Sequence, residues 1–190
     1  MRTPDFGGGT DPRGAGAEAG GAPAEAAQPG DCGFQPHGYC PTNVRRTAGT
    51  AVVALILDTG PLYASLDRRD ADYLACRRLI ETCDEPLVIP APVLVEVDYW
   101  IHARLHPGVL VALLDDIRAG AYLIEELLLS DYDRVRSLCD RYDDADVGFV
   151  DAAVLAVVER LNEPKLATLD HRHFGTLRPR HVDALRLLPG

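Results

Sequence analysis

Lysine is almost absent from this chain, since only one of its 19 basic residues, Lys165, is a lysine. The other basic side chains are arginines, whose planar guanidinium groups suit contacts with phosphate. The chain also has no excess of basic charge, because its formal net charge is −10 at pH 7. This charge excludes the basic surface of a protein that coats nucleic acid. A nuclease is still compatible with it, because metal ions neutralise part of an acidic active site.

Paired cysteines and long apolar segments are also missing. The chain has five cysteines, an odd number, and no apolar secretory segment near its start. We therefore expect a reducing, cytoplasmic compartment. Cys32, His37 and Cys40 are close enough in sequence for zinc, but a structural zinc site needs a fourth ligand. No run approaches the roughly 18 apolar residues of a membrane span, so no membrane association is expected.

Residues 1–50 contain few branched apolar side chains and are rich in Gly, Ala and Pro. Such a segment buries too little apolar surface to offset the entropy lost when a chain becomes ordered. Two interpretations remain open: a disordered extension, or a mis-assigned start whose true position is near Val53. The other residues, 51–190, are enough for one domain with a hydrophobic core.

From residue 51 onward, short apolar runs alternate with amphipathic segments, as in α/β proteins. This alternation predicts a mostly parallel central sheet with helices on both faces. The expected strands are 52–57, 87–89, 121–129, 165–169 and 184–188. The expected helices are a short one after Asp58, then 70–83, 91–105, 108–118, 130–142 and 149–161.

Two acidic residues directly follow predicted strands. Asp58 ends the run Val-Val-Ala-Leu-Ile-Leu, and Asp170 ends Lys-Leu-Ala-Thr-Leu. In an open parallel sheet, functional sites form at the carboxyl ends of strands. Taken singly, each aspartate could simply cap the next helix or turn.

Two further acids lie within predicted helices, on faces that should be apolar. Glu96 shares its face with Val93 and Trp100, and Asp151 shares its face with Val154. An acid buried among apolar side chains costs several kcal/mol unless another charge offsets it. No arginine lies three or four positions from either acid. A buried ion pair would therefore need a partner from elsewhere in the fold.

The four acids together indicate a divalent cation. Carboxylate oxygens favour Mg²⁺ or Mn²⁺ over zinc, and carboxylates around such cations are typical of phosphodiester hydrolysis. His171 and His173 flank Asp170 and are expected to contact substrate phosphate or to lie on the surface. Several arginines are candidate phosphate contacts: Arg68, Arg69, Arg172, Arg178 and Arg180.

These motifs resemble those of PIN-domain ribonucleases of the VapC toxin type. The resemblance covers residues 54–190 and rests on Leu57–Pro61, the helix with Glu96, Gly148–Ala156 and Ala167–Phe174. It implies a PIN-like fold and an endoribonuclease with four catalytic acids: Asp58, Glu96, Asp151 and Asp170. Of these, it makes Asp58 and Asp151 the ligands of Mg²⁺, and Asp146 an accessory acid. It also implies a homodimer, an RNA substrate and a cognate antitoxin with a cationic tail.

Three other classes share some of these features. A haloacid-dehalogenase phosphatase also has an acid after its first strand, but it needs a second aspartate at the position of Gly60. A PIN-domain nuclease of RNA maturation would work without an antitoxin. A non-catalytic module could use the same acidic pocket to bind a cationic peptide.

Overall fold

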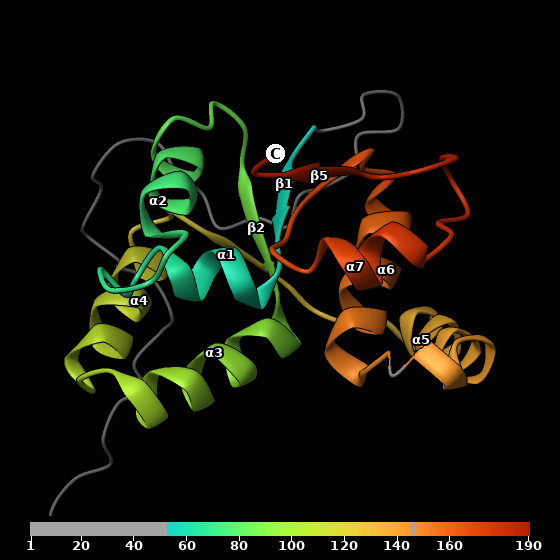
Figure 1. Cartoon of the computed structure of the whole chain (residues 1–190), viewed down its shortest axis with the longest axis horizontal. Coiled ribbons are helices and arrows are strands. Elements are labelled where there is room, and N and C mark those ends of the chain that lie inside the picture. The colour runs from blue at the N-terminus through green and yellow to red at the C-terminus, as the bar shows by residue number, and fades with distance from the viewer. Residues whose placement is uncertain (1–52, 146) are drawn as a thin grey trace, which may run out of the picture. The chain divides into compact units, whose positions relative to one another are not determined.

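The computed structural model describes residues 53–145 and 147–190. The predicted extension over residues 1–50, the Cys32–His37–Cys40 group and Asp146 lie outside the described residues. At the centre is a five-stranded sheet with strand order β3-β2-β1-β4-β5, in which every neighbouring pair is parallel (Figure 1). The strands are β1 (Leu55–Leu57), β2 (Leu87–Pro90), β3 (Leu123–Glu125), β4 (Lys165–Ala167) and β5 (Arg186–Leu188).

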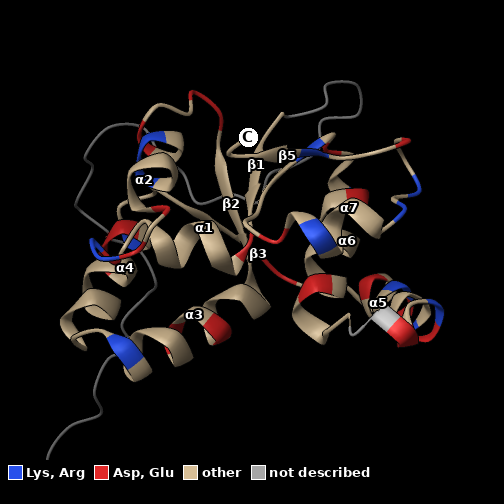
Figure 2. Cartoon of the chain, viewed as in Figure 1, with Lys and Arg blue, Asp and Glu red and all other residues tan. Residues whose placement is uncertain are grey.

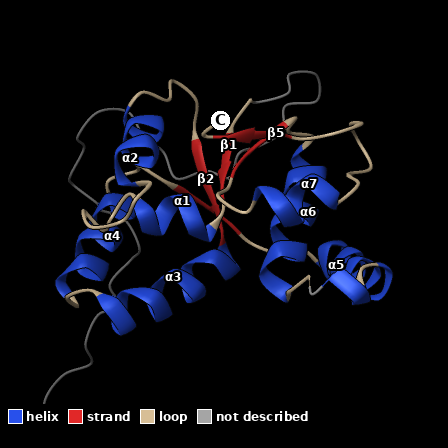
Figure 3. Ribbon diagram, in the orientation of Figure 1, coloured by secondary structure: helices blue, strands red, loops and turns tan. Residues whose placement is uncertain are grey.

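Helices flank this sheet on both sides (Figure 3). In the view of Figure 1, α1 to α4 lie to the left of the sheet and α5 to α7 to the right. Their bounds are α1 (Thr59–Ala64), α2 (Tyr73–Glu81), α3 (Ala91–Arg104), α4 (Gly108–Arg118), α5 (Leu129–Arg141), α6 (Phe149–Leu161) and α7 (His171–Thr176), with a 3₁₀ turn at Asp143–Ala145. The predicted α/β class and its mostly parallel sheet are confirmed.

The core lies around the central strand and one helix. All three residues of β1 are buried, as expected for a strand covered on both faces. In α6, every residue from Ala152 to Val158 is buried. Such a helix can be apolar around its whole circumference. The acid at the start of α6, Asp151, is therefore held by one of the most deeply packed elements of the fold.

One short helix was not predicted. The segment His171–Thr176 has no apolar periodicity, yet it forms α7. Asp170 caps this helix by accepting a 2.8 Å hydrogen bond from the His173 amide, and Phe174 is buried beneath it. The cap from Asp170 and the burial of Phe174 thus stabilise this helix without a periodic apolar pattern. At the other end of the chain, the first strand starts at Leu55 and is shorter than the predicted 52–57.

The turns after β1 and β4 are in close contact. The Asp58 amide donates a 2.9 Å hydrogen bond to the Ala167 carbonyl, which continues the pairing of the two strands by one residue. A Cβ on Gly60 would lie 3.2 Å from Cβ of Leu169, so a side chain at this position would push the two turns apart. This packing places Asp58 beside the segment that leads to Asp170.

None of the helices in the described part of the chain has the length and apolarity needed to cross a membrane.

Candidate active site

Asp58 stands at the N-cap position of α1, but its side chain does not cap that helix. Only 5% of the residue is exposed. Its Oδ2 accepts a 2.8 Å hydrogen bond from the Thr168 hydroxyl, which comes from the turn after β4. The capping interpretation that the sequence left open therefore does not explain this carboxylate.

The surroundings of Asp58 disfavour its charged form. Burial raises the pKa of this carboxyl from 3.8 to about 6, although hydrogen bonds from Thr168 and from the Thr59 amide act in the opposite direction. The negative charges of Asp151 and Glu96 raise the pKa further. Thr59, the next residue after Asp58, bonds to Glu96, so these two acids lie at the same end of the sheet.

Glu96 enters the site from α3 and is half-buried. Its Oε2 accepts a 2.6 Å hydrogen bond from the Thr59 hydroxyl in the first turn of α1. This bond joins α1 to α3 and orients the carboxylate. The charge of Glu96 also contributes to the raised pKa of Asp151, so Glu96 lies near both of the other acids.

Asp151 lies in the first turn of α6, where the helix dipole favours an anion. The Gly148 amide donates a 3.4 Å hydrogen bond to its Oδ2. Burial is the main cause that raises the pKa of Asp151, and the charges of Asp170 and Glu96 add to it. The Gly148 amide and His173 oppose this rise. The net direction is upward, so burial and the neighbouring acids outweigh these two contributions.

Asp170 differs from the other three acids because both of its oxygens are engaged. Oδ1 accepts from the His173 amide at 2.8 Å, and Oδ2 lies 2.8 Å from Nδ1 of the His173 ring. For this residue the capping interpretation is correct. Its charge still acts on Asp151, so it belongs to the same cluster. His173 thus contacts an acid of the site, while His171 is exposed and its Nε2 lies 3.2 Å from the Thr168 carbonyl.

Arginine does not balance this cluster. Among the described residues, no ion pair involves Asp58, Glu96 or Asp151. The buried guanidinium groups pair elsewhere: Arg134 with Glu159, and Arg160 with Glu125 and Asp131. Figure 2 shows acidic positions on α3, at the start of α6 and after β3, around the carboxyl end of the sheet. Repulsion among Asp58, Glu96 and Asp151 is therefore not offset by an arginine or lysine within the described structure.

The donor set suits a hard divalent cation with a partly open coordination shell. Within residues 53–145 and 147–190, no group of three His, Cys, Asp or Glu side chains is already arranged as a metal site. Mg²⁺ is commonly bound by one or two carboxylates together with waters and substrate phosphates. Asp58 and Asp151 meet that requirement. The negative charges of neighbouring acids raise the pKa of both carboxyls, and neither has a cationic partner in the described chain. Asp170, held by His173, is a weaker candidate.

Two threonines of the site were overlooked in the sequence. Thr59 and Thr168 orient Glu96 and Asp58 respectively, although both lie within the motifs that identified the acids. The signal was a hydroxyl residue within two positions of an acid, directly after a strand or one residue beyond. Of the arginines predicted to contact phosphate, Arg69 is paired with Asp67 at 3.0 Å.

A family model for the PIN domain matches residues 55–177, which span the sheet from β1 to β4 and all four acids. The chain belongs to the PIN domain family. It is similar to Ribonuclease VapC26 of Mycobacterium tuberculosis (strain ATCC 25618 / H37Rv), with 29% identity over 125 residues. The match covers 66% of this chain and 93% of the relative.

Solved structures of toxins share the fold. The crystal structure of Mycobacterium tuberculosis VapC20, described as a sarcin–ricin loop cleaving toxin, has a TM-score of 0.58 at 20% identity and covers 63% of this chain and 92% of its own. VapBC2 from Rickettsia felis, bound to a DNA fragment from its promoter, has a TM-score of 0.53 at 16% identity. That match covers 71% of this chain and 97% of the other. The predicted PIN-like fold is thereby confirmed.

Proposed function

We propose that this protein is a Mg²⁺-dependent endoribonuclease and the toxin of a toxin–antitoxin system. One observation carries the catalytic part of the proposal. Asp58 is buried at the end of the central strand, beside Glu96 and Asp151, without a cation from the described chain. A purely structural acid in that position would be expected to have an arginine partner. The similarity to a VapC ribonuclease supports RNA as the substrate.

In this proposal Asp58 and Asp151 hold Mg²⁺, and Mn²⁺ can replace it, while Glu96 and Asp170 complete the acidic site. When bound, such a cation lowers the pKa of a water, holds the scissile phosphate and stabilises the leaving oxygen. The oxygen of water bonds to phosphorus and gives up one proton, and the bond from phosphorus to the 3′ oxygen breaks. The 3′ oxygen takes up one proton, so the protons balance. The products have 5′-phosphate and 3′-hydroxyl ends.

The chain's own residues supply orientation. The Thr168 hydroxyl fixes one oxygen of Asp58, and the Thr59 hydroxyl fixes one oxygen of Glu96. Each of these two acids then has a second oxygen to direct toward the reacting groups. Supports that hold ligands in this way matter nearly as much as the ligands themselves.

The remaining parts of the proposal concern partners. We expect a homodimer in the cytoplasm and a cognate antitoxin with a cationic tail. Structures of toxin–antitoxin complexes with this fold support an antitoxin as the partner. A PIN-domain nuclease of RNA maturation would have the same site without such a partner, and a non-catalytic module would bind a cationic peptide there.

The decisive experiment is expression of the chain with and without the product of the neighbouring upstream gene. We expect growth arrest and RNA cleavage when the chain is expressed alone, and neither when both are present. Cleavage that causes no growth arrest would favour RNA maturation. A purified protein that cuts no RNA with Mg²⁺ or Mn²⁺ would contradict the catalytic proposal.

A further inference from the structure

An open groove of about 360 Å³ lies directly beside the acidic site. Its volume is at the lower end of the range of small-molecule pockets, which is about 300–1,000 Å³. The start of α3, the segment after β3, and the first turns of α5 and α6 form its walls. Glu96 belongs both to the groove and to the acidic site. Whatever occupies the groove therefore lies next to the proposed reaction.

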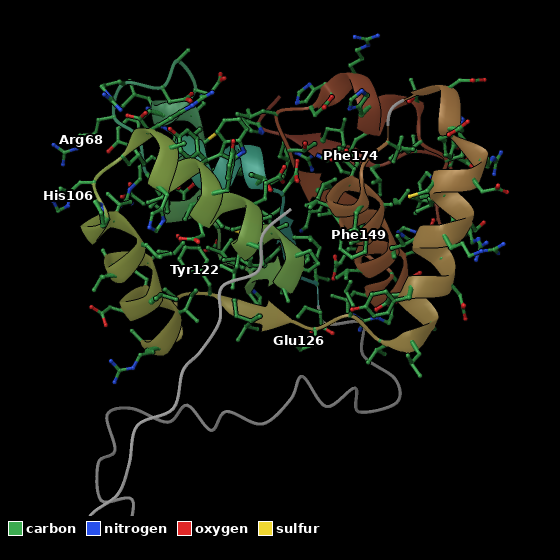
Figure 4. The ribbon with its side chains drawn as sticks, turned by 90° about the horizontal axis from the view of Figure 1, so that it is seen from below. Arg68, His106, Tyr122, Glu126, Phe149 and Phe174 are labelled. Carbon is green, nitrogen blue, oxygen red and sulfur yellow. The ribbon has the colours of Figure 1, made fainter. Side chains whose placement is uncertain are left out.

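Two aromatic rings are exposed in this groove. Tyr132 of α5 is 50% exposed and Phe149 of α6 is 49% exposed. Their ring centroids are 6.4 Å apart, with planes inclined by 31°. Figure 4 shows Phe149 and Glu126 between α3 and α5, in the view from below. Exposed aromatic pairs beside a catalytic site are unusual for a surface that contacts only water, since each ring leaves apolar area unburied.

The charges around the groove select the part of a nucleotide that can enter it. Its lining, as far as the chain is described, contains no basic side chain, and its charged members are Glu96 and Glu126. Carboxylates accept hydrogen bonds but repel phosphate. A nucleobase is uncharged, has flat apolar faces, and can carry N–H donors along its edge. The groove is therefore complementary to a base and not to the backbone of the same strand.

We propose that Tyr132 and Phe149 form a subsite that stacks one unpaired base of single-stranded RNA, next to the phosphate that is cut. This inference rests on the proposed ribonuclease function. Proteins that read single-stranded RNA stack splayed bases on aromatic side chains and bond to the base edges. Glu126 accepts from the edge of the base, so a base with N–H donors there is preferred. The subsite gives the enzyme a preference for the base beside the cleavage position.

The first test separates binding from chemistry. We expect Phe149→Ala and Tyr132→Ala each to raise KM for a short single-stranded RNA by roughly 5- to 100-fold, in line with the loss of one stacked base. The value of kcat should change little, because stacking holds substrate and transition state alike. Phe149→Tyr restores a ring and should recover most of the affinity. Leu74→Ala on α2, at a side chain that is 77% exposed, is the matched control and should leave KM unchanged.

The second test identifies the contact itself. Substrates with one abasic nucleotide are compared, and wild-type enzyme should lose affinity at one position beside the cut. In Phe149→Ala the same abasic substrate should cause little further loss, because the ring and the base act on each other. If the substitution and the abasic nucleotide each reduced affinity independently, so that their losses added up in the combination, the proposal would be overturned. In that case the RNA does not stack on this ring, even though cleavage by the wild type would leave the ribonuclease function standing.

A third measurement does not depend on cleavage. Asp58→Asn is mixed with a single-stranded RNA that carries 2-aminopurine, and stacking is followed as quenching of its fluorescence. Quenching that disappears in the double variant Asp58→Asn with Phe149→Ala is the expected result. Equal quenching in the two proteins would overturn the subsite. This conclusion would hold even if the wild type cut no RNA. A shift from dimer to monomer in the Tyr132→Ala and Phe149→Ala proteins would assign the groove to a second copy and would likewise overturn it.

Discussion

The hydroxyl of Thr168 donates a 2.8 Å hydrogen bond to Oδ2 of Asp58, although the two residues are 110 positions apart in the sequence. Each follows directly on a strand, β1 for Asp58 and β4 for Thr168, and these strands are parallel neighbours. The same hydroxyl accepts a 3.0 Å hydrogen bond from the Asp170 amide. One small side chain thus positions the most buried acid of the site and the turn that carries another.

Removing this hydroxyl should make Asp58 harder to ionise. The bond from Thr168 lowers the pKa of Asp58, so Thr168→Val should raise that pKa above its present value of about 6. We expect the acidic limb of the profile of kcat/KM against pH, which reports the free enzyme, to move to higher pH. Thr168→Ser keeps the hydroxyl and serves as the control. If the acidic limb of the Thr168→Val profile did not move, the hydrogen bond from Thr168 would have no influence on the ionisation of Asp58.

The proposed metal ligands can be tested by neutral substitutions. Asp58→Asn and Asp151→Asn should each reduce cleavage by at least about 100-fold while the protein stays folded. Cleavage by the wild type should stop in EDTA and return with Mg²⁺ or Mn²⁺. Added Mg²⁺ should also raise the melting temperature of the wild type, as any ligand of the native state does, and this rise should vanish in the variants. The control is Asp133→Asn, at an exposed acid of α5.

The raised pKa of Asp58 also predicts how stability without metal depends on pH. The folded state binds this proton more tightly than the unfolded chain, whose carboxyl titrates near 3.8. Above pH 6 the ionised Asp58 therefore costs the folded state about 3 kcal/mol, and the cost disappears as the pH falls from about 6 to about 4. Asp58→Asn, measured in EDTA, should be more stable than the wild type at pH 7. Its advantage should be lost at pH 4, as denaturant titrations at the two pH values would show.

The sequence predicted the elements whose packing follows a simple pattern. The runs Leu55–Leu57 and Leu87–Pro90 were recognised because central parallel strands are apolar on both faces. The helix predicted over residues 149–161 has the bounds of α6. By contrast, α7 was missed because one cap and one buried ring, Phe174, stabilise it, and neither produces a period.

For the site, the sequence supplied the acids but not their supports. Acids at strand ends and on apolar helix faces are visible in the sequence, because their positions conflict with the pattern of burial. The hydroxyls of Thr59 and Thr168 cause no such conflict, since threonine is common at both places. Their importance depends on which strands are neighbours, a property of the sheet order. The assignment of the four acids to catalysis itself stays a prediction.

Helix packing also decides which arginines stabilise the fold. Arg134 of α5 donates to both oxygens of Glu159 on α6, at 2.7 and 2.8 Å, and both side chains are buried. Arg134→Met should lower the free energy of unfolding by about 3–5 kcal/mol, because it leaves the buried Glu159 carboxylate with the Arg180 amide but without a cation. The exposed pair Arg77–Glu81 is the matched control, and Arg77→Met should cost less than about 1 kcal/mol. Similar losses in the two variants would contradict the distinction.

The acidic site should also bind a cationic side chain from a partner, in competition with the metal. Residues 51–190 have 24 acidic against 15 basic side chains, and the described chain places no arginine or lysine in an ion pair with Asp58, Glu96 or Asp151. An arginine from an antitoxin tail would supply the missing charge and lower the raised pKa values of Asp58 and Asp151. Substrate RNA would then be excluded while the fold remained intact.

Inhibition by the upstream gene product tests this competition. We expect inhibition of the wild type to weaken as the Mg²⁺ concentration is raised. The Asp58→Asn protein should bind the partner more weakly than the wild type, as a direct binding measurement would show. Replacing the arginines of the partner's tail by alanine should cost at least about 2 kcal/mol of binding, or roughly 30-fold in Kd, because truncating a buried charge leaves the facing carboxylates without a partner. Equal inhibition by the wild-type and alanine versions, or inhibition that does not respond to Mg²⁺, would show that the partner acts from another surface. The toxin–antitoxin assignment would survive that result, because an antitoxin can also inhibit by covering the path of the RNA.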